Sequence, residues 1–167
     1  MFDELTQNDI DKMKEEIEYR KLVVRKEALE AVKEARAHGD LSENFEYHAA
    51  KKDKNQNESR IRYLERMIKT AKIISDDSNE DEVGLNNTVT IYIEEDDCEE
   101  TYKIMTTIRG NSLKNKISID SPMGKALLGH KVGDRVLIKV NDNYSYYVVI
   151  KNIEKTSEDD EDNIRKF

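Results

Sequence analysis

The sequence predicts an α+β protein in which a long antiparallel helical hairpin is followed by a small α+β domain. Three observations lead to this prediction. Residues 7–37 contain neither proline nor glycine and are rich in the helix-forming residues Lys, Glu, Ala and Arg. From Thr88 onward, apolar residues recur at every second position, which is typical of strands. Between these regions, residues 75–82 (SDDSNEDE) contain no apolar side chain.

Apolar and small residues recur in both helical regions at the spacing of a coiled coil. In the first region, Ile10, Ile17, Val24 and Ala31 lie seven residues apart. In the second region, alternating steps of three and four residues join Tyr47, Ala50, Lys54, Asn57, Ile61, Leu64, Ile68 and Ala71. Because only a short segment containing Gly39 separates the two regions, we expect an antiparallel coiled-coil hairpin with arms of about 45 Å.

We expect the rest of the chain to form a small domain with a largely antiparallel sheet and one short helix. Period-two runs predict strands at Val89–Ile93, Tyr102–Met105, Lys116–Ile119, Val136–Val140 and Tyr146–Ile153. In residues 121–129, Ser121 can cap a helix, Pro122 suits its first position and Gly129 can end it. The predicted parts are a hairpin over 1–75 with its tip near 38–44, an acidic linker over 76–82, a domain over 83–156, and a disordered acidic tail over 157–167.

Composition and charge exclude several classes of protein. The chain is 37% hydrophobic and 38% charged, and its net charge is −8. Lys and Arg balance Asp and Glu over residues 1–75, so residues 76–167 carry the whole net charge. Such a surface repels free nucleic acid, so we expect contact with DNA or RNA only where another protein holds it in place. No apolar run is long enough to span a membrane, and the single Cys98 excludes an internal disulfide, so we expect a cytoplasmic protein.

The turn AHGDLSEN, residues 37–44, allows a structural and a chemical interpretation. Gly39 suits a position of positive φ after a helix, and Asp40 with Glu43 fits a capping box that opens the second helix. Alternatively, Asp40 and Glu43 form an exposed acidic pair at the end of a long projection. Two carboxylates can donate oxygen ligands to Mg²⁺ but are too few for its six-coordinate shell. A partner would have to supply the remaining ligands.

Basic residues near this turn also allow two interpretations. Arg36, Lys51 and Lys52 lie within a stretch that also carries acidic side chains, so they could form an ordinary solvated face. They could equally form a small patch that contacts phosphate groups. His38 and His48 are weak candidates for a metal site, because no third ligand lies at helical spacing.

The chain contains two extended motifs, EARAHGDLSENFEYHAAKKDK at residues 34–54 and SIDSPMGKALLGHKVGD at residues 118–134. Both resemble motifs of the Gre family of transcript cleavage factors, which act on bacterial RNA polymerase. The resemblance extends roughly from Leu5 to Ile153. It implies a coiled-coil hairpin joined to an FKBP-like domain, in a monomer that has no activity of its own. The factor stimulates the polymerase to hydrolyse backtracked RNA near its 3′ end, which rescues arrested complexes.

The resemblance also implies roles for individual residues. The hairpin is expected to reach the active site through the secondary channel, where Asp40 and Glu43 help hold a Mg²⁺ ion that is shared with the polymerase. Asn44 matches the neighbour of this acidic pair and is expected to order the loop. Basic residues of the patch, namely Arg36, Lys51 and Lys52, are expected to contact the backtracked RNA.

For docking on the channel rim, the second motif offers Ser121, Pro122 and Gly124. These residues could instead serve only as a helix start and a tight packing contact. The sequence departs from the family pattern at Phe45, where alanine is usual, and this adds bulk beside the acidic pair.

Three other functions remain open. A related factor could bind the same channel and inhibit the polymerase. An FKBP-like fold could belong to a prolyl isomerase or chaperone, although its pocket should be lined by aromatic side chains and fold alone does not transfer function. The coiled coil could also be a plain scaffold, which would predict apolar residues near the turn rather than the charged ones present.

Overall fold

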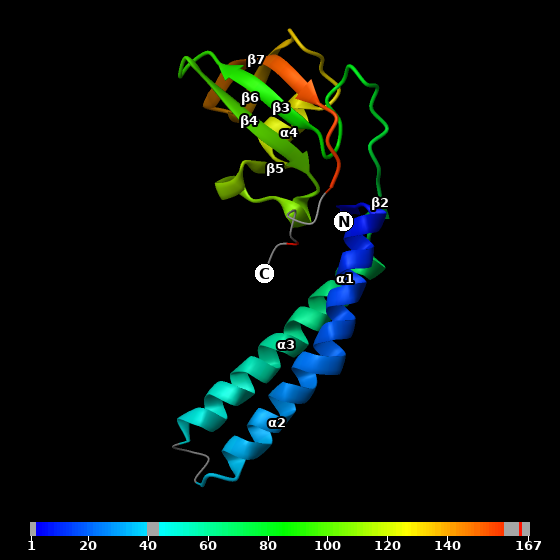
Figure 1. Ribbon diagram of the computed structural model, residues 1–167. Coiled ribbons are helices and arrows are strands. Elements are labelled where there is room, and N and C mark those ends of the chain that lie inside the picture. Colours follow the sequence, from blue (N-terminus) through cyan, green and yellow to red (C-terminus); the bar gives the residue numbers. More distant parts are fainter. Residues whose placement is uncertain (1–2, 40–43, 159–163, 165–167) are drawn as a thin grey trace. The chain divides into compact units, whose positions relative to one another are not determined.

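The computed structural model describes residues 3–39, 44–158 and 164. The chain forms two compact units that divide after Lys72, with residues 4–6 grouped with the second unit. Figure 1 shows the elements, which in chain order are β1 (Glu4–Leu5), α1 (Gln7–Tyr19), the π-turn η1 (Arg20–Val24), α2 (Arg25–Arg36), α3 (Phe45–Lys69), β2 (Lys72–Ile73), β3 (Thr88–Ile93), β4 (Cys98–Met105), the 3₁₀ turns η2 (Thr107–Arg109) and η3 (Ser112–Lys114), β5 (Lys116–Ser118), α4 (Pro122–Leu127), β6 (Arg135–Asn141) and β7 (Tyr144–Glu154). Most of the predicted tail lies outside the described residues.

The first unit is the predicted antiparallel helical hairpin. One arm consists of α1, η1 and α2, and the other is α3, which runs back along both helices (Figure 1). Ile10 and Met13 of α1 are buried, as are Ile61 and Leu64 of α3. Towards the turn, Ala35 is the buried apolar residue of α2. The buried side chains of the seam are thus large and apolar at the base of the hairpin, and the buried one near the turn is small.

Charged and polar side chains occupy the middle of the hairpin. Glu16 Oε2 accepts hydrogen bonds from Arg20 Nε at 2.7 Å and Arg60 Nε at 2.8 Å. Arg20 Nη1 in turn donates to Asn57 Oδ1 at 3.0 Å. Arg60 and Asn57 are each only 4% exposed. A buried polar group that has one matching partner across the seam favours a single helix register, because a shift would leave it unpaired.

The first arm contains a π-turn that the sequence pattern does not predict. Within η1, the backbone N–H of Arg25 donates to the carbonyl of Arg20, five residues back. This wider turn changes which residues of α2 face the seam. Ala31, which we expected in the seam, is exposed, whereas the adjacent Val32 is half-buried. The prediction for Ala31 was therefore wrong.

The second unit contains a five-stranded sheet with the order β5-β4-β3-β7-β6. All neighbouring strands are antiparallel except β4 and β5, which are parallel. Each of the five predicted strands is present, and the predicted short helix is α4. The largely antiparallel sheet with one helix is therefore confirmed. Strands β1 and β2 form a separate two-stranded sheet.

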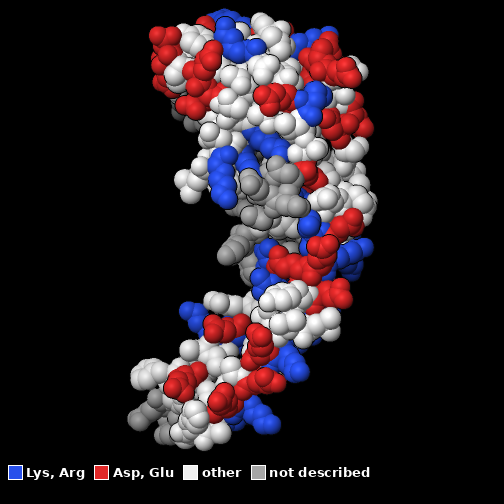
Figure 2. All heavy atoms as spheres, viewed as in Figure 1, with Lys and Arg blue, Asp and Glu red and all other residues white. Residues whose placement is uncertain are grey.

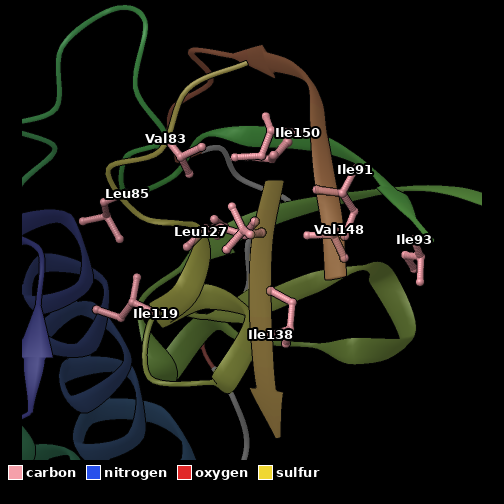
Figure 3. Packing of buried hydrophobic residues seen from close by; sticks show 12 residues of the cluster. Val83, Leu85, Ile91, Ile93, Ile119, Leu127, Ile138, Val148 and Ile150 are labelled. Atoms are coloured by element: carbon pink, nitrogen blue, oxygen red, sulfur yellow. The ribbon is translucent and has the colours of Figure 1, made fainter. Parts of the chain in front are cut away.

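One apolar cluster fills the second unit. Alternate residues of the central strands point into it, including Val89, Ile91 and Ile150, which are fully buried. Leu127 of α4 lies among these side chains, and Ile138 of β6 lies beside them (Figure 3). The period-two pattern of the sequence thus corresponds to one buried face of the sheet.

The segment predicted as a linker, residues 76–82, is hydrogen-bonded to the end of β7. The Nζ atom of Lys155 lies 2.7–3.0 Å from four oxygen atoms, which belong to Ser78, Asn79, Glu82 and Asn87. Asn87 is fully buried and also donates to Asp76 at 3.2 Å. Gly84 leaves room for this segment, because a Cβ atom there would lie 2.0 Å from Ser78 Oγ.

Charge is distributed differently over the two units. On the hairpin, acidic and basic side chains alternate, whereas acidic patches cover parts of the second unit (Figure 2). Among the described residues, no helix is both long and apolar enough to cross a membrane.

Candidate functional site at the hairpin tip

The hairpin tip begins where α2 ends. The C-cap is Ala37, whose N–H donates to the carbonyls of Lys33 and Glu34. Two residues later, Gly39 has φ of +128°, which side chains with a Cβ atom rarely adopt. The positive φ predicted for Gly39 is confirmed, one position later than the helix C′ site. Glycine therefore lets the chain leave the helix abruptly and enter the turn.

Asn44 closes the turn from the other side. It is the N-cap of α3, and its Oδ1 accepts a hydrogen bond from the N–H of Tyr47 at 3.0 Å. Its Nδ2 donates to the carbonyl oxygen of Ala35 at 2.7 Å. One side chain thus pairs with an N–H in the first turn of α3 and with a carbonyl in the last turn of α2, which also accepts from the N–H of His38 at 3.1 Å. Asn44 therefore fixes the distance between the two helix ends.

The capping box predicted from Asp40 and Glu43 is wrong, because α3 begins at Phe45 and is capped by Asn44. An amide is the better cap here because it accepts from α3 and donates to α2 at once, which a carboxylate cannot do. Asp40 and Glu43 themselves lie outside the described residues. The acidic pair therefore stays a prediction from the sequence, and the structure describes the residues on either side of it, up to Gly39 and from Asn44.

Arg36 and Tyr47 form a contact across the hairpin behind the turn. Arg36 Nη2 donates to the Tyr47 hydroxyl at 3.5 Å, and its guanidinium lies 5.6 Å from the ring centroid. The hydrogen bond from Arg36 lowers the pKa of the Tyr47 phenol, and the positive charges of Lys51 and Lys54 act in the same direction. Arg36, Lys51 and Lys54 therefore place positive charge around the Tyr47 hydroxyl.

Lys51 and Lys52 line a shallow recess on α3. The other residues that line it are His48, Asn55, Gln56 and Ser59. Of the three predicted RNA-contacting residues, the structure thus brings Lys51 and Lys52 together, while Arg36 pairs with Tyr47 instead. Asn55, Gln56 and Ser59 were not predicted from the sequence, although they follow Lys52 by three, four and seven residues, which places them on its face of the helix.

His38 and His48 do not come together as a metal pair. His38 Nδ1 lies 3.2 Å from Glu46 Oε2, and the His48 ring packs edge-on against Tyr47 with centroids 5.5 Å apart. The described part of the chain contains no group of three or more His, Cys, Asp or Glu side chains that could hold a metal ion. A complete metal centre is therefore not built from the residues that the structure describes.

The second motif has clear structural roles. Ser121 caps α4 by accepting from the N–H of Gly124 at 3.0 Å, and it donates to the carbonyl of Ser118 at 2.6 Å. Pro122 occupies the first turn of the helix. A Cβ atom on Gly124 would lie 2.1 Å from the Ser118 carbonyl oxygen, so no larger residue fits. Helix capping and tight packing are thus established for the motif, while its contact with a polymerase stays a prediction.

Comparison with known proteins adds two matches to family descriptions. Residues 4–73 match the family described as "Transcription elongation factor, N-terminal". Residues 77–155 match the one described as "Transcription elongation factor, GreA/GreB, C-term". Together the two matches cover almost the whole chain, and their boundary falls close to the division between the two compact units.

Individual relatives agree with these matches. The chain is 47% identical over 137 residues to transcription elongation factor GreA of Thermoanaerobacter pseudethanolicus, covering 81% of this chain and 87% of the relative. It is 44% identical over 135 residues to GreA of Bacillus subtilis, with coverage of 81% and 86%. Among solved structures, GreA factor homolog 1 of Thermus thermophilus matches with a TM-score of 0.43 and 27% identity, over 92% of this chain and 99% of that one.

Proposed function

The chain belongs to the GreA/GreB family of transcription elongation factors, and from that membership we propose how its hairpin acts. Factors of this family stimulate the transcript cleavage that RNA polymerase itself performs, and they are not the nuclease. This chain accordingly functions as a GreA-type elongation factor. Bacterial RNA polymerase is its partner, so its place of action is the cytoplasm, and we propose that it acts there as a monomer.

The hairpin tip delivers Asp40 and Glu43 into the polymerase active site through the secondary channel. The observation that carries this proposal is the double hydrogen bond of Asn44, which ties α2 to α3 immediately after the acidic pair in sequence. A turn whose two ends are fixed presents its side chains with less loss of conformational freedom than a loose one. Asn44 is thus a positioning residue for the acidic pair.

The carboxylates of Asp40 and Glu43 have the right chemistry for Mg²⁺ but are incomplete as a site. Mg²⁺ requires six oxygen ligands in octahedral geometry, and two side chains supply a minority of them. The remaining ligands would come from the polymerase and the RNA, so this protein holds the ion only in the complex. In two-metal phosphoryl chemistry, the ions activate the attacking oxygen and stabilise the leaving one. The contribution of this chain is to add two carboxylate ligands to the Mg²⁺ ion that the polymerase binds less tightly.

Lys51 and Lys52 are suited to contact the phosphates of the backtracked RNA, because both line the recess on α3. Arg36 lies across the seam, where its guanidinium is held by Tyr47 and contributes positive potential. On the second unit, Ser121, Pro122 and Gly124 fix the start of α4, and we propose that this motif contacts the channel rim. Its rigid geometry supports that role, because a preformed surface loses little freedom on binding.

The test uses backtracked elongation complexes of a bacterial RNA polymerase with Mg²⁺. The wild-type chain should release short 3′ RNA fragments. The double variant Asp40→Ala, Glu43→Ala should bind the polymerase equally well and cleave at least about 10–100-fold more slowly, as expected when metal ligands are lost. Glu34→Ala, which removes an exposed carboxylate from α2, is the matched control and should retain full activity.

Two outcomes would contradict the proposal. Cleavage by the double variant at the wild-type rate would show that the acidic pair has no part in the reaction. Binding of the wild-type chain with suppression of cleavage would instead identify an inhibitor of the same channel.

A further inference from the structure

One face of α3, turned away from the seam, carries a continuous set of polar and aromatic side chains. Phe45, His48 and Lys52 follow one another at steps of three and four residues, and Asn55 and Ser59 continue the same spacing. The seam residues of α3, such as Asn57, lie on the other side of the helix. We call the face formed by Phe45, His48, Lys51, Lys52, Asn55, Gln56 and Ser59 the outer stripe of α3.

Phe45 stands at the tip end of this stripe and is 86% exposed. Leaving so much of an aromatic side chain in water forfeits the gain from burying it, so the residue does not serve the stability of the hairpin. Its ring is the first side chain of α3, next to the cap residue Asn44. The next ring on the stripe, His48, is held edge-on against Tyr47.

The chemistry of the recess fits a single-stranded nucleic acid. None of its six lining residues carries a carboxylate, although the chain as a whole has a net charge of −8. Lys51 and Lys52 can neutralise phosphates, while the amides of Asn55 and Gln56 can both donate and accept hydrogen bonds. Proteins that bind unpaired strands combine such a positive track with aromatic rings on which bases stack.

We propose that Phe45 stacks on an unpaired base of the displaced RNA 3′ segment, and that the outer stripe of α3 forms the track along which this segment lies. The proposal rests on the proposed function, since it concerns the same RNA in the same complex. It adds a contact to a base, whereas the role proposed for Lys51 and Lys52 is to neutralise phosphates, which are present whether or not a nucleotide carries its base. Phe45 is thus a substrate-contacting residue that distinguishes RNA bearing bases from a bare backbone.

The experiment combines a variant of Phe45 with RNA that lacks single bases. Backtracked complexes of the polymerase are prepared with normal RNA and with RNA containing one abasic nucleotide, placed in turn at each displaced position. Initial cleavage rates are measured at protein concentrations below saturation. With normal RNA, Phe45→Ala should lower the rate about 5–150-fold, the range expected for loss of one stacked base. Phe45→Tyr, which keeps an aromatic ring, should retain most of the activity.

The abasic RNA identifies the cause of the loss. At the position where the base stacks on Phe45, removal of the base should slow the wild-type chain by a similar factor, and Phe45→Ala should then cause no further loss. The matched control is Leu22→Ala, which removes an exposed apolar side chain elsewhere on the hairpin and should change neither rate.

Each other result has a separate meaning. An unchanged rate for Phe45→Ala on normal RNA, or an equal loss on normal RNA and on every abasic RNA, would overturn the stacking proposal while leaving the proposed function intact. Absence of cleavage stimulation by the wild-type chain on normal RNA would instead refute the proposed function.

Discussion

The hairpin and the globular unit are held together by different interactions. In the globular unit, twelve buried apolar residues form one cluster between the sheet and α4 (Figure 3). In the described part of the hairpin, by contrast, few apolar side chains are buried, and the middle of the seam is occupied by Glu16, Arg60 and Asn57. Two helices that touch along a single seam can bury apolar side chains only on their facing sides, because no third element covers their other sides.

This difference predicts that the two units respond differently to solution conditions. Apolar burial is insensitive to pH and moderate salt, whereas ion pairs depend on both. The apolar core of the globular unit should therefore respond little to pH, while the ion pairs in the middle of the hairpin should make that region sensitive to acid.

Removing a core side chain should have the largest effect. Ile138 of β6 is fully buried, so Ile138→Ala should lower the free energy of unfolding of the globular unit by about 2–5 kcal/mol. Leu137 on the same strand is 44% exposed, so Leu137→Ala is the matched control and should change little. Urea denaturation measures both. Equal losses for the two variants would contradict the assignment of one buried sheet face.

Breaking the central ion pairs of the hairpin should have an intermediate effect. Glu16 accepts from both Arg20 and Arg60, and Arg60 is almost fully buried. Because the Glu16 side chain is itself 26% exposed, we expect Glu16→Gln to cost about 2 kcal/mol, less than the loss of a fully buried partner. Hydrogen exchange of hairpin amides measures the loss, and the exposed Glu15→Gln serves as the control.

The same carboxylate predicts a pH dependence. Burial raises the pKa of Glu16, but hydrogen bonds from Arg60 and Arg20 outweigh it and hold the pKa below its ordinary value of 4.5. A lowered pKa in the folded state means that the stabilisation is complete above pH 4.5 and is lost as the pH falls further. The protection factors of hairpin amides, which are exchange rates corrected for the intrinsic rate at each pH, should fall in acid in the wild type and change less in Glu16→Gln. Loss of amide protection at the same pH in the wild type and in Glu16→Gln would contradict this role of Glu16.

Loss of the tip cap should have the smallest effect on stability. Asn44→Ala removes the bond from Tyr47 N–H and the bond to Ala35, so α3 should lose about 1 kcal/mol and its first turn should exchange faster. Asn44→Asp keeps the acceptor for Tyr47 but lacks the donor to Ala35. If the link between the helices positions the acidic pair, both variants should reduce transcript cleavage, although only Asn44→Ala should destabilise the helix. Transcript cleavage at the wild-type rate with Asn44→Asp would show that the N-cap bond to Tyr47 is sufficient and that the bond to Ala35 does not position the acidic pair.

The fold was predictable from the sequence because its two periodicities are strong. The three-and-four spacing up to Ile68 and the period-two runs after Thr88 both correspond to buried faces in the structure. The π-turn at Arg20–Val24 was not predictable, since no glycine or proline marks it and its geometry depends on the packing of the whole arm. Ala31 was misplaced for that reason.

The candidate site was predictable only in part. A capping box at Asp40 and Glu43 was a reasonable local pattern, but a pattern in one helix cannot reveal that Asn44 also reaches the carbonyl of Ala35, nine residues away. The recess residues Asn55 and Gln56 were missed because amides on a charged helix carry no distinctive signal. Their grouping became visible only when the face of α3 was known.

The contacts of Lys155 join two segments of the globular unit that are far apart in the sequence. Because one ammonium group at the end of β7 joins four oxygens from residues 78–87, the first and last segments of this unit are fastened to each other. A chain shortened after Thr156 would keep that fastening, whereas one shortened two residues earlier would release both segments together. Mechanical force applied to residues 78–87 or to the segment after β7 would therefore act on the same hydrogen bonds of the Lys155 ammonium group.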